Sequence, residues 1–140
     1  MDTISVLDLI PQRPPFVMIN SLLYADKSKA NTVFQILKEN LFIDKEGNFS
    51  EAGIIENIAQ TCAAHIGYMN RSQAMKIGVI GAVKNLEIYK LPKYNQTIET
   101  SIEVTNIVFE TTIVQAKVMC KETLIAVCEM KVSITEKTIN

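Results

Sequence analysis

The sequence is poor in the residues from which metal centres and disulfide frameworks are built. Its 140 residues include three cysteines and one histidine, and Cys62, Cys120 and Cys128 form no C-x-x-C pair. Zinc sites require several such ligands at characteristic spacing, so we expect no metal site. The odd number of cysteines fits buried, reduced thiols that pack as small hydrophobic side chains. A nucleophilic role for Cys62 would require an activating base beside it.

Long apolar runs and an excess of charge are missing too. The longest apolar run, 77–83, has seven residues, whereas a membrane-spanning helix needs about 20. The chain does not open like a secretory signal, so we expect a cytoplasmic protein. A net charge of -1 excludes a globally basic nucleic-acid binder and an acidic disordered chain. No glycine-rich phosphate loop, H-E-x-x-H or G-x-S-x-G is present, so we expect no cofactor.

Hydrophobic periodicity divides the chain into one long helix and several long strands. Alternation at period two predicts strands over 16–24, 31–37, 77–89, 96–108, 111–120 and 123–135. Isoleucines and Cys62 recur at helical spacing and predict one helix over 52–69, with Ser50 as its N-cap. The segment 2–9 predicts a short helical turn, and the three prolines that follow it forbid regular structure there.

The resulting order, β-β-α-β-β-β-β, predicts one α+β domain over residues 1–140. A helix laid on one face of a long antiparallel sheet buries the apolar faces of both. This is the hot-dog arrangement, in which the sheet wraps around one central helix. Long regular strands with exposed edges invite pairing, so we expect a dimer or a higher oligomer.

Three sequence segments resemble motifs of the β-hydroxyacyl-acyl carrier protein dehydratases. The segment 10–20, IPQRPPFVMIN, resembles the family signature L-P-H-R-x-P-F-L-L-V-D. The segment 55–60, IENIAQ, resembles the helix motif I-E-x-M-A-Q, and 93–96 stands where the family has P-G-D-Q. A closer likeness, carried by DKEG at 44–47 and by residues 53–65, is to a diverged branch found in aryl-polyene and flexirubin pigment pathways.

The resemblance implies the hot-dog fold and a substrate held as a thioester of acyl carrier protein or coenzyme A. It also implies protomers joined sheet edge to sheet edge, as a homodimer or higher oligomer or as a heterodimer with a related dehydratase.

The sequence departs from the family at the positions of its catalytic groups. The family carries its catalytic histidine in G-H-F-P, fourteen residues before the helix glutamate, and here that position is Phe42. The family has P-G at the helix start, with a glycine amide that polarises the thioester carbonyl; Ser50-Glu51 stands there. In the N-terminal signature, the histidine is replaced by Gln12 and the aspartate by Asn20.

Dehydration of a β-hydroxyacyl thioester requires a base for the α-proton, an acid for the leaving hydroxyl and donors for the enolate charge. The resemblance makes Glu56 the candidate acid, although the helix dipole also favours a glutamate near a helix start. Gln60 lies one turn further on and can orient the Glu56 carboxyl. Asp44 is either a replacement base or a turn residue. His65 lies half a turn out of phase with Glu56, so we expect a packed, hydrogen-bonded core histidine.

The N-terminal signature supplies Gln12, Arg13 and Phe16 as candidate contacts with the substrate or its carrier. Arg13 in particular would meet the phosphopantetheine group or the acidic carrier protein, and the alternative is a polar surface loop.

Three functions therefore remain open. The first is a dehydratase that works through Glu56 with a base other than histidine. The second is a non-catalytic acyl-binding subunit that completes a dehydratase by pairing with a competent partner. The third is a hot-dog thioesterase in which Glu56 activates water.

Overall fold

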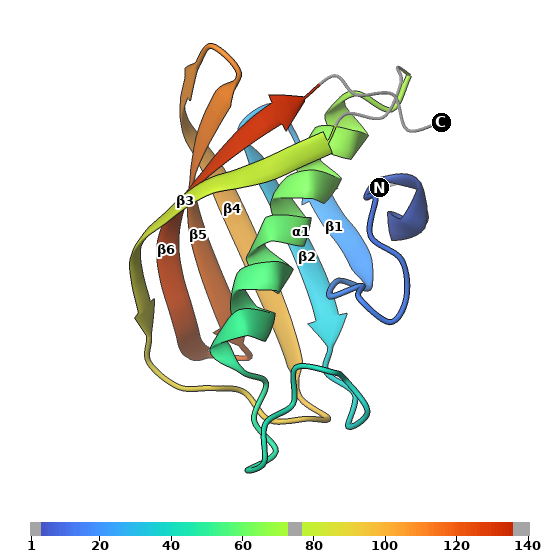
Figure 1. The fold of residues 1–140 in the computed structure, drawn as a ribbon, viewed down its shortest axis with the longest axis vertical. Coiled ribbons are helices and arrows are strands. Elements are labelled where there is room, and N and C mark those ends of the chain that lie inside the picture. The colour runs from blue at the N-terminus through green and yellow to red at the C-terminus, as the bar shows by residue number, and fades with distance from the viewer. Residues whose placement is uncertain (1–3, 73–76, 136–140) are drawn as a thin grey trace.

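The computed structural model describes residues 4–72 and 77–135. The described chain contains one short 3-10 turn, one long α-helix and six strands. In chain order these are η1 (Val6–Asp8), β1 (Ser21–Ala25), β2 (Lys29–Gln35), α1 (Glu51–Met69), β3 (Ile77–Ile88), β4 (Thr97–Val108), β5 (Thr111–Cys120) and β6 (Thr123–Thr135). The sheet curls around α1, which confirms the predicted α+β hot-dog fold (Figure 1).

The six strands form one sheet in the order β1-β2-β4-β5-β6-β3, and every neighbouring pair is antiparallel. The two edges of the sheet are therefore β1 and β3. Of these, β1 has only 5 residues, whereas β3 has 12 and carries two irregularities in its register with β6. The long free edge of the sheet therefore belongs to β3.

The apolar stripe of α1 faces the concave side of the sheet. Ile54, Ile58, Cys62 and Ile66 are buried there against the inward-facing side chains of the strands. All three cysteines are buried and free, as expected. Burial raises the pKa of the Cys62 thiol to about 12, which leaves no nucleophilic thiolate at neutral pH. In the described parts of the chain, no helix combines the length and the apolarity that a membrane crossing requires.

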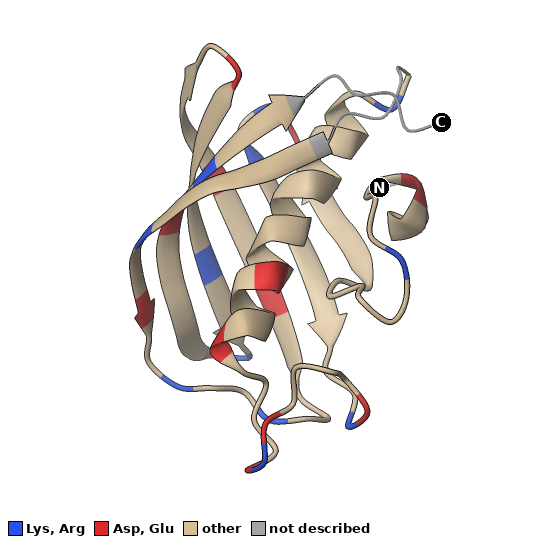
Figure 2. Cartoon of the chain, viewed as in Figure 1, with Lys and Arg blue, Asp and Glu red and all other residues tan. Residues whose placement is uncertain are grey.

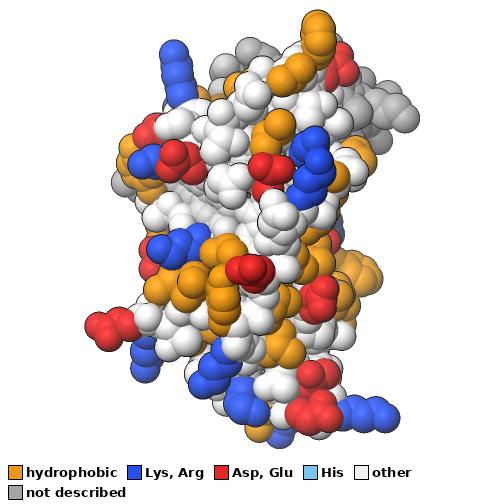
Figure 3. Space-filling model, turned by 90° about the vertical axis from the view of Figure 1, so that its left-hand side faces the viewer, with side chains coloured by type: hydrophobic (Ala, Val, Ile, Leu, Met, Phe, Trp, Pro, Cys, Tyr) orange, Lys and Arg blue, Asp and Glu red, His pale blue; other side chains and the backbone are white. Residues whose placement is uncertain are grey.

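The outer face of the sheet is polar. One row of polar side chains crosses five strands, with a lysine at each end and two glutamates and a glutamine between them: Lys29, Glu103, Gln115, Glu129 and Lys84. Gln115 Nε2 donates to Glu129 Oε1 at 3.0 Å. Figure 3 shows charged side chains of both signs scattered among exposed hydrophobic ones on the left-hand face of the molecule.

One local prediction was wrong, and a second held without the hydrogen bond that usually accompanies it. The strand predicted over 16–24 begins only at Ser21, because the backbone N–H and C=O of Met18 bond to side chains of α1 and cannot pair with a strand. Ser50 is the N-cap residue, as predicted, but its hydroxyl makes no capping hydrogen bond. Its backbone N–H instead donates to the Phe42 carbonyl at 2.9 Å.

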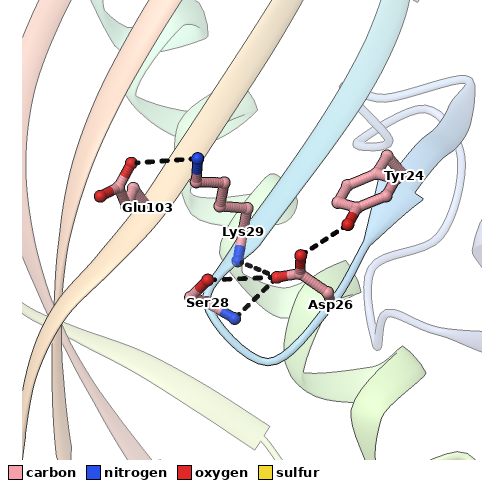
Figure 4. A network of polar contacts seen from close by, with 5 residues as sticks. All are labelled: Tyr24, Asp26, Ser28, Lys29 and Glu103. Carbon is pink, nitrogen blue, oxygen red and sulfur yellow. Dashed lines mark hydrogen bonds and ion pairs between the residues drawn. The ribbon is translucent and has the colours of Figure 1, made fainter.

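Strands β1 and β2 form an antiparallel hairpin, and Asp26 organises its turn. The Asp26 carboxylate accepts hydrogen bonds from the Tyr24 hydroxyl at 2.6 Å and from the backbone amides of Ser28 and Lys29, each at 2.8 Å (Figure 4). His65 Nε2 lies 2.6 Å from the Asp26 carbonyl oxygen, so α1 is fastened to this turn. The buried, hydrogen-bonded role expected for His65 is thereby confirmed.

The N-terminal segment packs on α1 where the helix has a glycine. A Cβ atom on Gly67 would lie 2.1 Å from the carbonyl oxygen of Leu9, a distance that backbone atoms cannot tolerate. Leu9 and Ile10 are buried at this contact together with Ala64. The absence of a side chain at Gly67 therefore lets the segment that carries Gln12 approach the helix.

Replacement of Gly67 by alanine is expected to destabilise the protein by roughly 1–3 kcal/mol, because the added methyl group forces the backbone of Leu9 away from α1. Gly81→Ala is the matched control, since its Cβ would have 3.6 Å to the nearest atom and the change should cost nothing. Urea unfolding of both variants measures the difference, and equal stability would contradict the packing described at Leu9.

The acid stability of the protein should depend on Asp26. The Tyr24 hydroxyl, followed by the Ser28 amide, lowers the pKa of the Asp26 carboxyl from 3.8 to about 2. Its contribution to folding is therefore complete above about pH 5 and is lost as the pH falls through about 2. We expect Asp26→Asn to be less stable than wild type at pH 5 and nearly equal to it at pH 2, with Tyr24→Phe between them. A stability difference that does not change with pH would argue against the charge as its cause.

Candidate active site

The side-chain amide of Gln60 holds the centre of the site together. Gln60 is fully buried on α1. Its Nε2 donates to the Phe16 carbonyl at 2.8 Å and to Glu56 Oε1 at 2.9 Å, and its Oε1 accepts the Met18 N–H at 2.6 Å. One amide therefore fixes the irregular segment after the prolines and orients the Glu56 carboxyl.

A second buried amide, Asn57, continues this polar seam across the core. Asn57 Nδ2 donates to the Met18 carbonyl at 2.7 Å, and its Oδ1 accepts the Thr100 hydroxyl at 2.5 Å. Thr61 donates to the Asn57 carbonyl, and its hydroxyl lies 2.7 Å from that of Thr32. The seam ties α1 to β4, to β2 and to the N-terminal segment. Sequence reasoning missed Asn57; the available signal was that three polar residues, at 57, 60 and 61, share one face of an apolar helix.

Glu56 lines a cavity of about 250 Å³ between α1, the N-terminal segment and β3. Its walls are Gln12, Glu56, Ala59, Ala63, Gly78, Val79, Ile80 and Val132. Alanines three and seven residues after Glu56 continue the same helix face, and their small side chains leave the space open. Glu56 is the only titratable residue among the walls. Figure 2 shows that the charged residues of α1 are acidic and lie in its lower half.

Gln12 contributes the second polar side chain of the cavity. Its Oε1 atom is buried without a hydrogen-bond partner, the only such side-chain atom in residues 4–72 and 77–135. An unpaired buried acceptor costs about 1–3 kcal/mol, so such atoms are usually found beside a ligand or water. Arg13 Nη1 donates to the carbonyls of Ile10 and Gln12 at 2.8 and 2.7 Å, which fixes the loop around Gln12.

The structure brings some of the candidate residues together and separates others. Glu56 and Gln60 are hydrogen-bonded, and Gln12 and Glu56 line one cavity. The Asp44 carboxylate accepts the amides of Glu46 and Asn48, so it shapes the turn before α1 and is not among the cavity walls.

The remaining candidates lie at the edge of the site. The Arg13 guanidinium lies on backbone carbonyls of its own loop. Phe16 exposes 57% of its side chain and meets the site only through its carbonyl. In the described residues, no cluster of His, Cys, Asp and Glu could hold a metal ion.

A six-stranded antiparallel sheet wrapped around one buried helix defines a protein of the hot-dog class. A model of the ApeP-like family, described as ApeP dehydratase, matches residues 4–138. The chain therefore belongs to the ApeP-like dehydratase family. This confirms the resemblance to the dehydratase-like proteins of aryl-polyene pathways.

Solved structures share the fold at low sequence identity. A chain of the dehydratase heterocomplex ApeI:P from Xenorhabdus doucetiae is 12% identical, with a TM-score of 0.89 over 97% of this chain and 94% of that one. Cj0977, a sigma28-regulated virulence protein from Campylobacter jejuni, is 17% identical, with a TM-score of 0.73 over 96% and 98%.

A hypothetical thioesterase from Streptococcus pneumoniae, solved with coenzyme A, is 10% identical, with a TM-score of 0.69 over 85% of this chain and 88% of that one. No curated protein matches by sequence. The structural likenesses establish the fold that the chain shares with dehydratase-like and thioesterase-like proteins.

Replacement of Gln60 by methionine is expected to destabilise the protein by roughly 2–4 kcal/mol, because the Met18 N–H and the Phe16 carbonyl lose a buried partner while the volume is kept. Gln115→Met is the matched control: Gln115 also bonds to a glutamate but lies on the exposed face, where such changes stay within about 0.5 kcal/mol. Denaturant unfolding compares them, and similar losses in the two variants would refute the central role of Gln60.

Proposed function

We propose that this protein is one subunit of a dehydratase that acts on β-hydroxyacyl thioesters of acyl carrier protein or coenzyme A. Glu56 is the acid of the reaction, and Gln60 orients it. The observation that carries this proposal is the hydrogen bond of 2.9 Å by which buried Gln60 holds Glu56 at the wall of a largely apolar cavity. A carboxyl group held in such a place is suited to general acid–base chemistry on a bound ligand.

The reaction divides the work between two groups. A base removes a proton from the carbon next to the thioester carbonyl, and the protonated Glu56 carboxyl gives its proton to the β-hydroxyl. Water leaves and a carbon–carbon double bond forms between the α- and β-carbons. The base then gives its proton to solvent and Glu56 takes one up from solvent, so both groups regain their starting states. Because Gln60 occupies Oε1 of Glu56, Oε2 is the oxygen available to the substrate.

We propose that the base comes from a partner chain. Glu56 is the only titratable wall residue, and the single histidine of the sequence bonds to the Asp26 carbonyl on another side of α1. In a second copy of the same chain, His65 would likewise be bonded to its own Asp26 carbonyl. We therefore favour a heterodimer with a related dehydratase that supplies a histidine, and the heterocomplex reported for ApeI:P supports this choice.

The free edge of β3 is the proposed joint with that partner. β3 pairs with β6 on one side only, and its Gly78, Val79 and Ile80 form a wall of the Glu56 cavity. Val79 and Ile80 expose 51% and 38% of their surface. A partner strand added at this edge would cover these side chains and bring its own residues next to the cavity.

Thioester hydrolysis is the second candidate function. It is favoured because Glu56 is the only titratable residue among the cavity walls. Glu56 alone would suffice to activate a water molecule for attack on a thioester carbonyl. The thioesterase-like protein solved with coenzyme A shares the fold, which agrees with this alternative. The two reactions differ in their products, because hydrolysis releases a free thiol and dehydration yields an enoyl thioester.

Glu56→Gln should lower the dehydration rate of the complex by about a hundredfold to ten-thousandfold, because the amide keeps the shape but cannot donate the catalytic proton. Glu51→Gln is the control, since Glu51 is exposed in the first turn of the same helix and should leave the rate unchanged. Enoyl-thioester absorbance and free-thiol release are measured together. An unchanged dehydration rate with an intact complex would identify a non-catalytic pairing subunit, and thiol release without enoyl product would identify a thioesterase.

A further inference from the structure

One wall residue of the Glu56 cavity, Gln12, has a hydrogen-bond acceptor that no group in the described chain uses. Gln12 Oε1 is buried and lacks a partner within the described chain, and the residue Gln12 lines the same cavity as Glu56. Buried amide oxygens in folded proteins are almost always paired with a protein group, an ordered water or a ligand. A hydrogen-bond donor that a ligand brings into the cavity would supply the missing partner of Gln12.

The position of Gln12 is fixed before any ligand arrives. Arg13 binds the backbone carbonyls on both sides of Pro11, and the preceding Leu9 rests on Gly67 of α1. Glu56 is equally constrained by its hydrogen bond to Gln60. The two polar groups of the cavity are held on separate elements, which is the arrangement expected of a preorganised binding site.

The side chains of the cavity walls limit the chemical class of ligand that can bind there. Apart from Gln12 and Glu56, every wall side chain is alanine, glycine, valine or isoleucine. Under the proposed function Glu56 is the acid, so a polar group that meets both residues must donate one hydrogen bond to the Gln12 oxygen and accept another from the Glu56 carboxyl. A neutral hydroxyl does both, whereas a carbonyl or ether oxygen cannot donate.

We infer that Gln12 recognises the β-hydroxyl of the acyl thioester and turns its oxygen towards Glu56. This inference rests on the proposed function and adds the specificity of the site. The enoyl product has lost the hydroxyl and with it the hydrogen bond to Gln12, so the same contact favours substrate over product. A saturated acyl thioester would leave the Gln12 oxygen unpaired and bind less tightly.

The test compares β-hydroxyhexanoyl-coenzyme A with hexanoyl-coenzyme A, which differ only in the hydroxyl, by calorimetric titration of the full chain. The wild-type protein should bind the hydroxylated compound about fivefold to tenfold more tightly, the net effect of one hydrogen bond. In Gln12→Met the ratio of the two dissociation constants should fall to about one, while the affinity for hexanoyl-coenzyme A stays unchanged. Gln12→Asn, which withdraws the oxygen by one methylene, should give the same loss, and Gln115→Met should retain the wild-type ratio.

If the ratio of the two dissociation constants stays at its wild-type value in Gln12→Met and Gln12→Asn, the inference is wrong. It is also wrong if both compounds lose affinity in parallel, because that result indicates a purely structural role for Gln12. A wild-type chain that binds neither compound would overturn it as well. Failure of the proposed function has a different signature: the preference for the hydroxyl depends on Gln12, yet the complex with a related dehydratase forms no enoyl thioester.

Discussion

The site depends on the hydrogen bonds made by the side-chain amide of Gln60. This amide replaces strand pairing for the residues after the prolines, because its oxygen and nitrogen bond to the backbone of Met18 and Phe16 as a neighbouring strand would. The remaining N–H bond of the same nitrogen reaches Glu56. Packing of the N-terminal segment and orientation of the Glu56 carboxyl therefore depend on the same side-chain amide.

The cavity exists because small side chains stand where the helix faces β3. Ala59 and Ala63 follow Glu56 on one face of α1, and Gly78 begins the opposite wall. Gly67 has a related role further along the helix, where it lets the Leu9 backbone approach and so brings Gln12 to the cavity. As a result, Gln12 and Glu56 are the two polar residues of an otherwise apolar cavity, which lies next to the long free edge of the sheet at β3.

Much of this architecture follows from local patterns. The period of 3.6 residues located α1 to within one residue at its start, and period-two alternation located β4, β5 and β6 closely. The same alternation is present over 16–24, where it led to a strand prediction that was wrong for the first residues. The backbone of Met18 bonds instead to side chains of α1 that lie 39 and 42 residues further along the chain. Sequence similarity identified Glu56 and Gln60, but their hydrogen bond could be anticipated only because they are one helical turn apart.

What the sequence determined by itself is the set of elements, the buried stripe of the helix and the hairpin at Asp26, since each depends on residues close together in the chain. Only the tertiary structure decided that Gln12 shares a cavity with Glu56, that Asp44 belongs to its own turn and that His65 serves the β1–β2 turn. The physical reason is that polar side chains are satisfied by whichever donor or acceptor the packed fold brings near. For Asn57 that partner is Thr100, 43 residues away, and no periodicity in the sequence encodes such a distance.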